Sequence, residues 1–406
     1  MNDNSRGAGT QAILLAAVVV TAMGQNLVFA ILPSLGRAAQ MEDFHVGLII
    51  SCSALVYALA SPIWGRFSEH AGRKPVLLIG LGGYTLGTLA FASLFWFGIQ
   101  GVLTGMSLLG ALVLARVLQA SLMAATPPAS TSYMADITST SARTRGMARI
   151  GAAHNLGTIL GPGFGGLLAG IHLVLPLYIT AGITAAMMVL VLLALRESPW
   201  ILQRAPMEQR FSMASATHQS FRAWMDRRVM DVLLVGVLVF MAFALVQQTL
   251  GFLFQDRLAM SPGEAAGAVG LAMVLAATSS MLAQGVVVQK MNWRPTLLLR
   301  LAMPVMAAGV LVLIHAAQQT GMTVAVALLG LGLGLAIPGV ASLASLRVGP
   351  EEQGTVAGLM SACPALGFIV GPVLGTGLYQ LNPVSPYWLV VAMLVPVSLL
   401  VWRLRQ

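Results

Sequence analysis

The sequence predicts an all-α polytopic membrane protein. Hydrophobic residues make up 57% of the 406 residues and charged residues only 9%, whereas a soluble domain has roughly 25% charged residues. The apolar residues gather in runs of about 20, the length that crosses a bilayer core as a helix. No run alternates polar and apolar residues as the strand of a β-barrel would. Helices are therefore expected, because each satisfies its own backbone hydrogen bonds in lipid.

Twelve apolar runs have the length of a membrane span. They cover residues 11–35, 45–65, 75–97, 102–128, 146–170, 176–195, 229–254, 265–288, 296–315, 321–345, 354–378 and 386–402. The first run is too long for the apolar part of a signal peptide, so we expect no cleaved leader. Cys52 and Cys363 both fall inside predicted spans, and we interpret them as small core residues without a disulfide or metal site.

The basic residues follow the positive-inside pattern of membrane proteins. If both termini lie on one side, 19 of the 22 Lys and Arg residues lie there, with Arg37 and Arg257 opposite and Arg116 inside a span. Cytoplasmic loops carry such an excess of positive charge, so we predict cytoplasmic termini. Topology accounts for the net charge of +9, and we expect no nucleic-acid partner.

The chain divides into two related halves. We expect six-helix bundles over residues 1–195 and 229–406, joined by a polar cytoplasmic connector over 196–228. Shifts of 220 and 210 residues superimpose several basic residues, glycines and prolines of the two halves. The matched positions include Arg37 with Arg257, Gly47 with Gly267, Pro75 with Pro295, Gly161 with Gly371, and Pro162 with Pro372. Parallel repeats with a substrate site at the midplane between them are known in transporters.

A short charged turn separates the second and third runs. Its sequence from Gly65 to Pro75 is GRFSEHAGRKP. It resembles the G-x-x-x-D-[RK]-x-G-[RK]-[RK] signature of the major facilitator superfamily of secondary transporters, with Glu69 and His70 where the family has Asp and a basic residue. The resemblance implies the major facilitator fold, with two pseudo-symmetric bundles of six helices.

The same resemblance implies that the turn is a cytoplasmic gate. Glu69 would pair with Arg73 or a neighbouring cation, and this network would reach the turn after the fourth span and break during transport. A plain positive-inside anchor is the alternative interpretation. The predicted gate residues are Gly65, Glu69, Gly72, Arg73, Lys74, Asp136, Arg143 and Arg145.

A glycine motif occupies the fifth run. Small residues four apart allow close approach of helix backbones, and a proline removes one backbone hydrogen bond and bends a helix. The motif resembles the antiporter signature G-x-x-x-G-P-x-x-G-G of the twelve-span drug:proton antiporter branch, which implies a hinge that closes the extracellular side. A glycine-rich packing face is the simpler alternative. The motif residues are Gly157, Gly161, Pro162, Gly165 and Gly166.

Arg116 is the one charge placed well inside a span. A charge at the bilayer centre costs about 2.5–3.5 kcal/mol on insertion scales, so this side chain should face a cavity or a partner. With Gln119 one turn away, it resembles the fourth-span motif R-x-x-Q-G, although Ala120 replaces the last glycine. The resemblance implies substrate contact or proton coupling. An arginine that snorkels or binds backbone carbonyls is the alternative.

Polar residues of other spans extend this predicted site. In the family the first, fourth, seventh and tenth helices line the cavity, so amides on these helices are candidates for substrate contact. Each amide could instead form a hydrogen bond between helices. The predicted substrate-binding residues are Arg116, Gln119, Gln25, Asn26, Gln247 and Gln248.

No acidic residue lies well inside a predicted span, because Asp231 and Asp256 are near the ends of the seventh. A cavity with an arginine and no carboxylate has a positive potential and favours anionic solutes over lipophilic cations. His154 in the fifth run is the candidate for proton coupling, because its ordinary pKa is near neutral. A histidine that only bonds to a carbonyl is the alternative.

These patterns favour a proton-coupled exporter in the inner membrane of a bacterium. The cargo would be a hydrophobic drug, by the resemblance, or an anionic metabolite such as a carboxylate siderophore, by the charges. An importer of sugars or organic acids is the alternative, and a membrane-embedded enzyme or sensor is an alternative of another class. No catalytic residues and no ATP-binding loop are found, so we expect a lipid-embedded monomer without cofactors, driven by the proton gradient.

Overall fold

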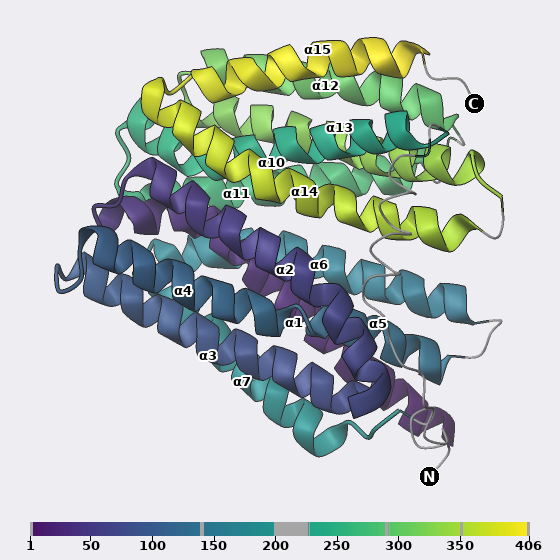
Figure 1. Ribbon diagram of the computed structural model, residues 1–406. Coiled ribbons are helices and arrows are strands. Elements are labelled where there is room, and N and C mark those ends of the chain that lie inside the picture. The colour runs from purple at the N-terminus through teal and green to yellow at the C-terminus, as the bar shows by residue number, and fades with distance from the viewer. Residues whose placement is uncertain are drawn as a thin grey trace. The chain divides into compact units, whose positions relative to one another are not determined.

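The computed structural model shows an all-helical chain (Figure 1). It describes residues 3–138, 142–198, 226, 228–288, 291, 293–349 and 352–403, and these contain no β-strand. The helices are α1 Asp3–Ala38, α2 Asp43–Ala71, α3 Arg73–Ile99, α4 Gly105–Met123, α5 Thr126–Ile137, α6 Arg143–Ala169, α7 Leu175–Ala194, α10 Met230–Leu258, α11 Pro262–Leu282, the π-helix η1 Ala283–Val288, α12 Pro295–His315, α13 Gln319–Leu346, α14 Gln353–Leu381 and α15 Ser385–Arg403.

The predicted spans coincide with these helices. Eleven helical segments of the described chain are long and apolar enough to cross a membrane, where α4 with α5, and α11 with η1, each count as one segment. The predicted span at 146–170 is α6, which has 27 residues but is rich in glycine and begins with two arginines. The predicted span at 102–128 is interrupted at Ala124 and Ala125, where Pro127 and Pro128 in the first turn of α5 cannot donate backbone hydrogen bonds to the preceding helix.

The chain forms two compact units. The first contains α1, α3 to α7, most of α2, and the beginning of α11 (Pro262–Gly270). The second contains α10, the rest of α11, α12 to α15, and the short segment Val46–Ser51 of α2. Most of the predicted connector, 199–225 and residue 227, lies outside the described residues.

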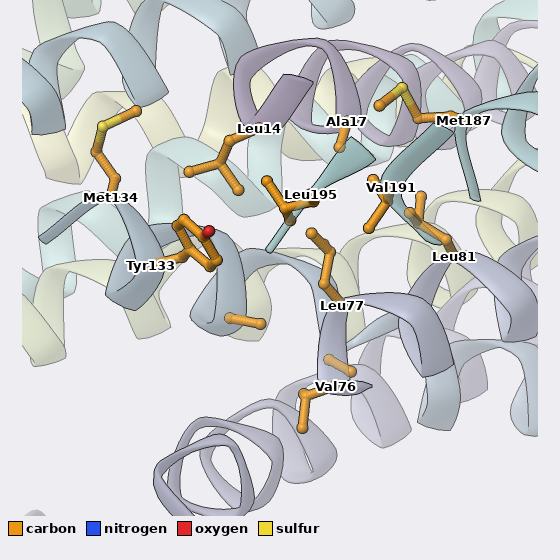
Figure 2. Packing of buried hydrophobic residues seen from close by; sticks show 12 residues of the cluster. Leu14, Ala17, Val76, Leu77, Leu81, Tyr133, Met134, Met187, Val191 and Leu195 are labelled. Carbon is orange, nitrogen blue, oxygen red and sulfur yellow. The ribbon is translucent and has the colours of Figure 1, made fainter. Parts of the chain in front are cut away.

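One buried apolar cluster organises part of the first unit (Figure 2). It joins Leu14 of α1, Leu77 of α3, Tyr133 of α5 and Val191 of α7 with Leu195, the residue that follows α7. Leu195 is only 1% exposed. Its burial fixes the start of the segment after α7, and the Tyr133 hydroxyl reinforces this by donating to the carbonyl oxygen of Arg196 at 2.7 Å.

Candidate functional site

The charged turn between α2 and α3 depends on Gly72. This residue has φ of +101°, a region in which residues with a Cβ are strained. A Cβ at this position would also lie 2.5 Å from Oε2 of Glu197. The turn therefore needs glycine both for its backbone and for the carboxylate beside it.

Glu197 is the acid that stabilises the start of α3. Its Oε1 accepts hydrogen bonds from the backbone N–H groups of Arg73 at 2.8 Å and Lys74 at 3.2 Å. The first N–H groups of a helix have no partner within the helix and carry a partial positive charge. The sequence patterns did not indicate this role, although Glu197 is the second residue after the sixth predicted span.

The Arg73 side chain forms a buried ion pair with Asp136. Its Nε donates to Oδ2 of Asp136 at 3.1 Å, and the two side chains are 6% and 12% exposed. Its Nη1 donates to the hydroxyl of Ser68 at 2.7 Å. The hydroxyl of Ser198 also donates to Oδ2 of Asp136, at 2.8 Å. This Arg73 network joins the end of α2, the start of α3, the end of α5 and the segment after α7.

Three predicted gate residues stand apart from the Arg73 network. Glu69 is exposed, and within the described residues it forms no hydrogen bond or ion pair, so the predicted pairing with Arg73 is not formed. The reason is helical geometry, since it is the neighbouring Ser68 that faces inward. Arg143 and Arg145 in the first turn of α6 are exposed and likewise form no such bond in the described chain.

Replacing Gly72 by alanine is expected to destabilise the protein. The backbone conformation alone, with φ of +101° and ψ of +155°, is essentially restricted to glycine and costs another residue about 1–3 kcal/mol. The collision with Glu197 adds to it. Thermal unfolding in detergent measures the effect. Gly101→Ala is the matched control, because Gly101 also has a positive φ, of +73°, but no atom within 4 Å of its Cβ position. Equal losses in the two variants would contradict the contact with Glu197.

The glycine motif of α6 forms a close seam with α1. A Cβ on Gly157 would lie 2.5 Å from the carbonyl oxygen of Val19, and one on Gly161 would collide with that of Met23. On Gly165 it would lie 2.8 Å from Cγ of Leu27. Three glycines four residues apart therefore let the two backbones touch, as the sequence predicted.

The last glycine of the motif packs elsewhere. A Cβ on Gly166 would lie 2.8 Å from the carbonyl oxygen of Ala266 and 3.0 Å from Cα of Gly270, both at the start of α11 in the first unit. Gly47, which the repeat pairs with Gly267 of α11, belongs to the second unit. There it lies against Thr376 and the carbonyl group of Pro372. The motif thus serves two helix contacts at once, one along α1 and one against α11.

Arg116 belongs to α4 and is buried against α3. It is 3% exposed, and its Nη1 donates to Oε1 of Gln119 at 2.6 Å. The Nε2 of Gln119 in turn donates to the hydroxyl of Thr88 at 2.7 Å and to the carbonyl oxygen of Tyr84 at 3.3 Å. The guanidinium carbon lies 5.5 Å from the centre of the Phe91 ring. Gln119 and Phe91 thus orient the guanidinium.

The other predicted site residues differ in their contacts. Asn26 donates to Thr158 of α6 at 3.3 Å, so it bonds helix to helix. Gln25 is partly exposed and contacts the sulfur of Met123 at 3.9 Å. In the second unit, Gln247 contacts the sulfur of Met273 at 3.8 Å, and both amide atoms of Gln248 are buried without a hydrogen-bond partner among the described residues.

The ring of the proton-coupling candidate has no polar contact with the part of the chain that the structure describes. His154 is exposed on α6, and its ring forms no hydrogen bond within the described residues. The alternative of a histidine held by a carbonyl group is therefore not seen. Its role in proton coupling stays a prediction.

The described acids all lie near helix ends. Each is either outside a helix or in a first or last turn, as the sequence predicted. Arg37 and Asp43 form a two-bond pair between α1 and α2, with distances of 3.0 and 2.9 Å. No carboxylate of the described chain forms an ion pair with Arg116.

The second unit has its own ion pairs near the starts of α10 and α14. Arg228 pairs with Asp226 and Glu352, each at 2.6 Å, and Arg347 pairs with Asp231 at 2.6 Å. Hydrogen bonds from Arg228 hold the carboxyl pKa values of Asp226 and Glu352 below their usual range. Lys290, in the second copy of the charged turn, lies outside the described residues.

These lowered pKa values predict a small pH dependence of stability. Carboxyl groups with a depressed folded-state pKa stabilise the protein above their unfolded pKa of about 4, and the contribution is lost as pH falls through the folded value. The unfolding temperature should therefore fall more steeply below about pH 5 in the wild type than in Arg228→Gln. The difference should be small because the groups are exposed. Parallel pH profiles for the two proteins would contradict it.

Comparison with known proteins identifies the family. Residues 14–372 match the Major Facilitator Superfamily. The chain belongs to this superfamily. It is 28% identical over 387 residues to Multidrug resistance protein 2 of Bacillus subtilis (strain 168), covering 92% of this chain and 90% of the relative. It is 27% identical over 381 residues to Tetracycline resistance protein, class E, of Escherichia coli, covering 91% and 88%.

A solved structure supports the same fold for this transporter. The human organic anion transporter MFSD10 (TETRAN) superimposes with a TM-score of 0.67 and 20% identity, covering 99% of this chain and 100% of that one. The predicted class is therefore confirmed. The protein is an all-α, multi-pass membrane transporter with the major facilitator fold.

Proposed function

We propose that this transporter exports a small molecule in exchange for protons by alternating access of its two repeats. The observation that carries the proposal is the antiporter motif, whose glycines are used at backbone contacts along α1 and α11. Relatives named for multidrug and tetracycline resistance, matched over about nine-tenths of the chain, support the export direction. The carrier works as a monomer in the lipid bilayer, without a cofactor and without catalysis.

The proposed location is the inner membrane of a bacterium, with both termini in the cytoplasm. The positive-inside distribution of Lys and Arg supports this orientation. In the proposed arrangement, residues 1–195 and 229–406 form the two repeats, and residues 196–228 connect them in the cytoplasm. A tag on either terminus should accordingly react with a membrane-impermeant label only after the cells are opened.

Two cargo classes follow from different observations. The names of the relatives favour hydrophobic drugs, whereas a buried arginine with no paired carboxylate favours anions such as carboxylate siderophores. Arg116→Ala separates them. Loss of anion export with retained cation export supports the anionic cargo, and the reverse result supports the drug cargo.

Inverted membrane vesicles with a pH-sensitive dye test the coupling. The vesicles are acidified by respiration and then challenged with a panel of cationic drugs, neutral sugars and carboxylate chelators. We expect a dye response to at least one compound, abolished by an uncoupler. No pH response to any compound, together with accumulation that is insensitive to uncouplers, would remove the antiport mechanism. Accumulation in right-side-out vesicles only would indicate an importer.

A further inference from the structure

We propose that Arg116, with Tyr84, forms a subsite that binds the carboxylate of an amphiphilic aromatic solute. This inference rests on the proposed function, because it names the cargo class of the same transporter. It is carried by the contacts around the guanidinium, all of which lie within the first unit.

Within the described residues, the guanidinium of Arg116 has no charged partner. The hydrogen bond from Nη1 goes to the neutral oxygen of Gln119, and the buried Nε has no hydrogen-bond partner in the described chain. Burying a cation without an anion is costly. A carboxylate satisfies both needs at once, since it accepts two parallel bonds from the guanidinium fork and neutralises its charge.

Tyr84 of α3 packs on the face of α4 that carries Arg116 and supplies a second buried donor. It is 1% exposed, and its hydroxyl is also buried without a hydrogen-bond partner in the described chain. It packs against Ala120 and Met123, which lie one and two turns after Arg116 on the same face of α4. Two buried donors that have no hydrogen-bond partner in the described chain, Nε of Arg116 and the Tyr84 hydroxyl, thus belong to side chains on one face of α4 or packed against it. A group that only accepts hydrogen bonds fits them better than a donor.

The surrounding side chains select the body of the solute. Phe91 lies under the guanidinium, and Tyr57 packs against the cluster of Tyr84 and Met123. Tyr57 and Gln25 are partly exposed, and Gln25 contacts Met123, so the buried cluster adjoins partly exposed side chains. Aromatic rings and a thioether favour a flat apolar body. The ligand class is an aryl carboxylate.

Binding to the purified transporter in detergent tests the subsite without a proton gradient. The probes are 2-naphthoate, its methyl ester and 2-naphthylmethylammonium, which share one ring system and differ in charge. The readout is the thermal shift of the intact protein by size-exclusion chromatography, titrated to an apparent Kd. We expect 2-naphthoate to stabilise the wild type, and the ester and the ammonium to bind about tenfold more weakly or not at all.

Three variants place the binding at the subsite. Arg116→Gln should abolish the naphthoate shift, and Tyr84→Phe, which keeps the ring packing, should weaken it several-fold. Gln119→Glu puts an internal carboxylate where Oε1 already accepts from Arg116, and it should abolish binding while the protein stays monodisperse. Arg149→Gln is the charge-matched control, because Arg149 is an exposed residue of α6 that bonds to Gln11.

The outcomes separate this inference from the proposed function. Equal binding of acid and ester, or wild-type affinity in Gln119→Glu, would overturn the subsite even if drug transport moves protons. Naphthoate binding that depends on Arg116, in a protein that moves no protons in vesicles, would overturn the coupling and leave the subsite standing.

Discussion

Replacing Gly161 by alanine should prevent α1 and α6 from packing. The new Cβ would collide with the carbonyl oxygen of Met23 and lie 2.9 Å from the backbone nitrogen of Leu27. Both are backbone atoms of α1, which cannot rotate away as a flexible side chain could. Overpacking of a well-packed core costs typically about 1–3 kcal/mol, and here the rigid backbones place the cost at the upper end. We expect a large loss of folded protein by size-exclusion chromatography and a lower unfolding temperature.

Gly151→Ala on the same helix is the matched control. A Cβ at Gly151 meets no atom within 4 Å, and alanine is about 1 kcal/mol more favourable than glycine inside a helix. This variant should match the wild type or exceed it in stability. If Gly161→Ala is as stable as Gly151→Ala, the seam is looser than the structure shows.

The spans and this seam could be predicted from sequence because both depend on local chemistry. A membrane helix needs only a long apolar run, whatever it packs against, and glycines four residues apart lie on one face of any helix. The break between α4 and α5 was missed because apolarity continues through Ala124 and Ala125. The two prolines that follow give the signal that could have located it.

The partners of the charged residues could be predicted only in part. Asp136 was correctly placed with the charged turn, but the acid at the start of α3 is Glu197, which is more than 120 residues away in sequence. Its position depends on the burial of Leu195 in the cluster shown in Figure 2. A motif that covers one turn contains no information about which distant segment packs against it. The motif favours Glu69 because it is close in sequence, but its side chain is exposed.

Breaking the buried ion pair should affect the transporter most strongly at its charged turn. Arg73→Gln leaves Asp136 with the Ser198 hydroxyl but without its cation, and removing one partner of a buried pair costs about 3–5 kcal/mol. The unfolding temperature should fall by several degrees. The double variant Arg73→Gln with Asp136→Asn should lose less than the sum of the two single variants, because it leaves no unpaired charge. Glu69→Gln is the matched control and should resemble the wild type.

This experiment also tests whether the Arg73 network only stabilises the fold, as a structural frame, or opens during transport, as a gate. Ser68, Arg73, Asp136 and Glu197 all belong to the first unit, so movement of one unit against the other does not require their bonds to break. A frame predicts that stability and transport fall together in Arg73→Gln and in Glu197→Gln. A gate predicts altered transport at nearly unchanged stability, because a bond that must open in each cycle cannot dominate the folded state. Because the pair is buried and internal to one unit, we expect the parallel loss. Transport that is impaired in a variant with wild-type unfolding temperature would favour the gate.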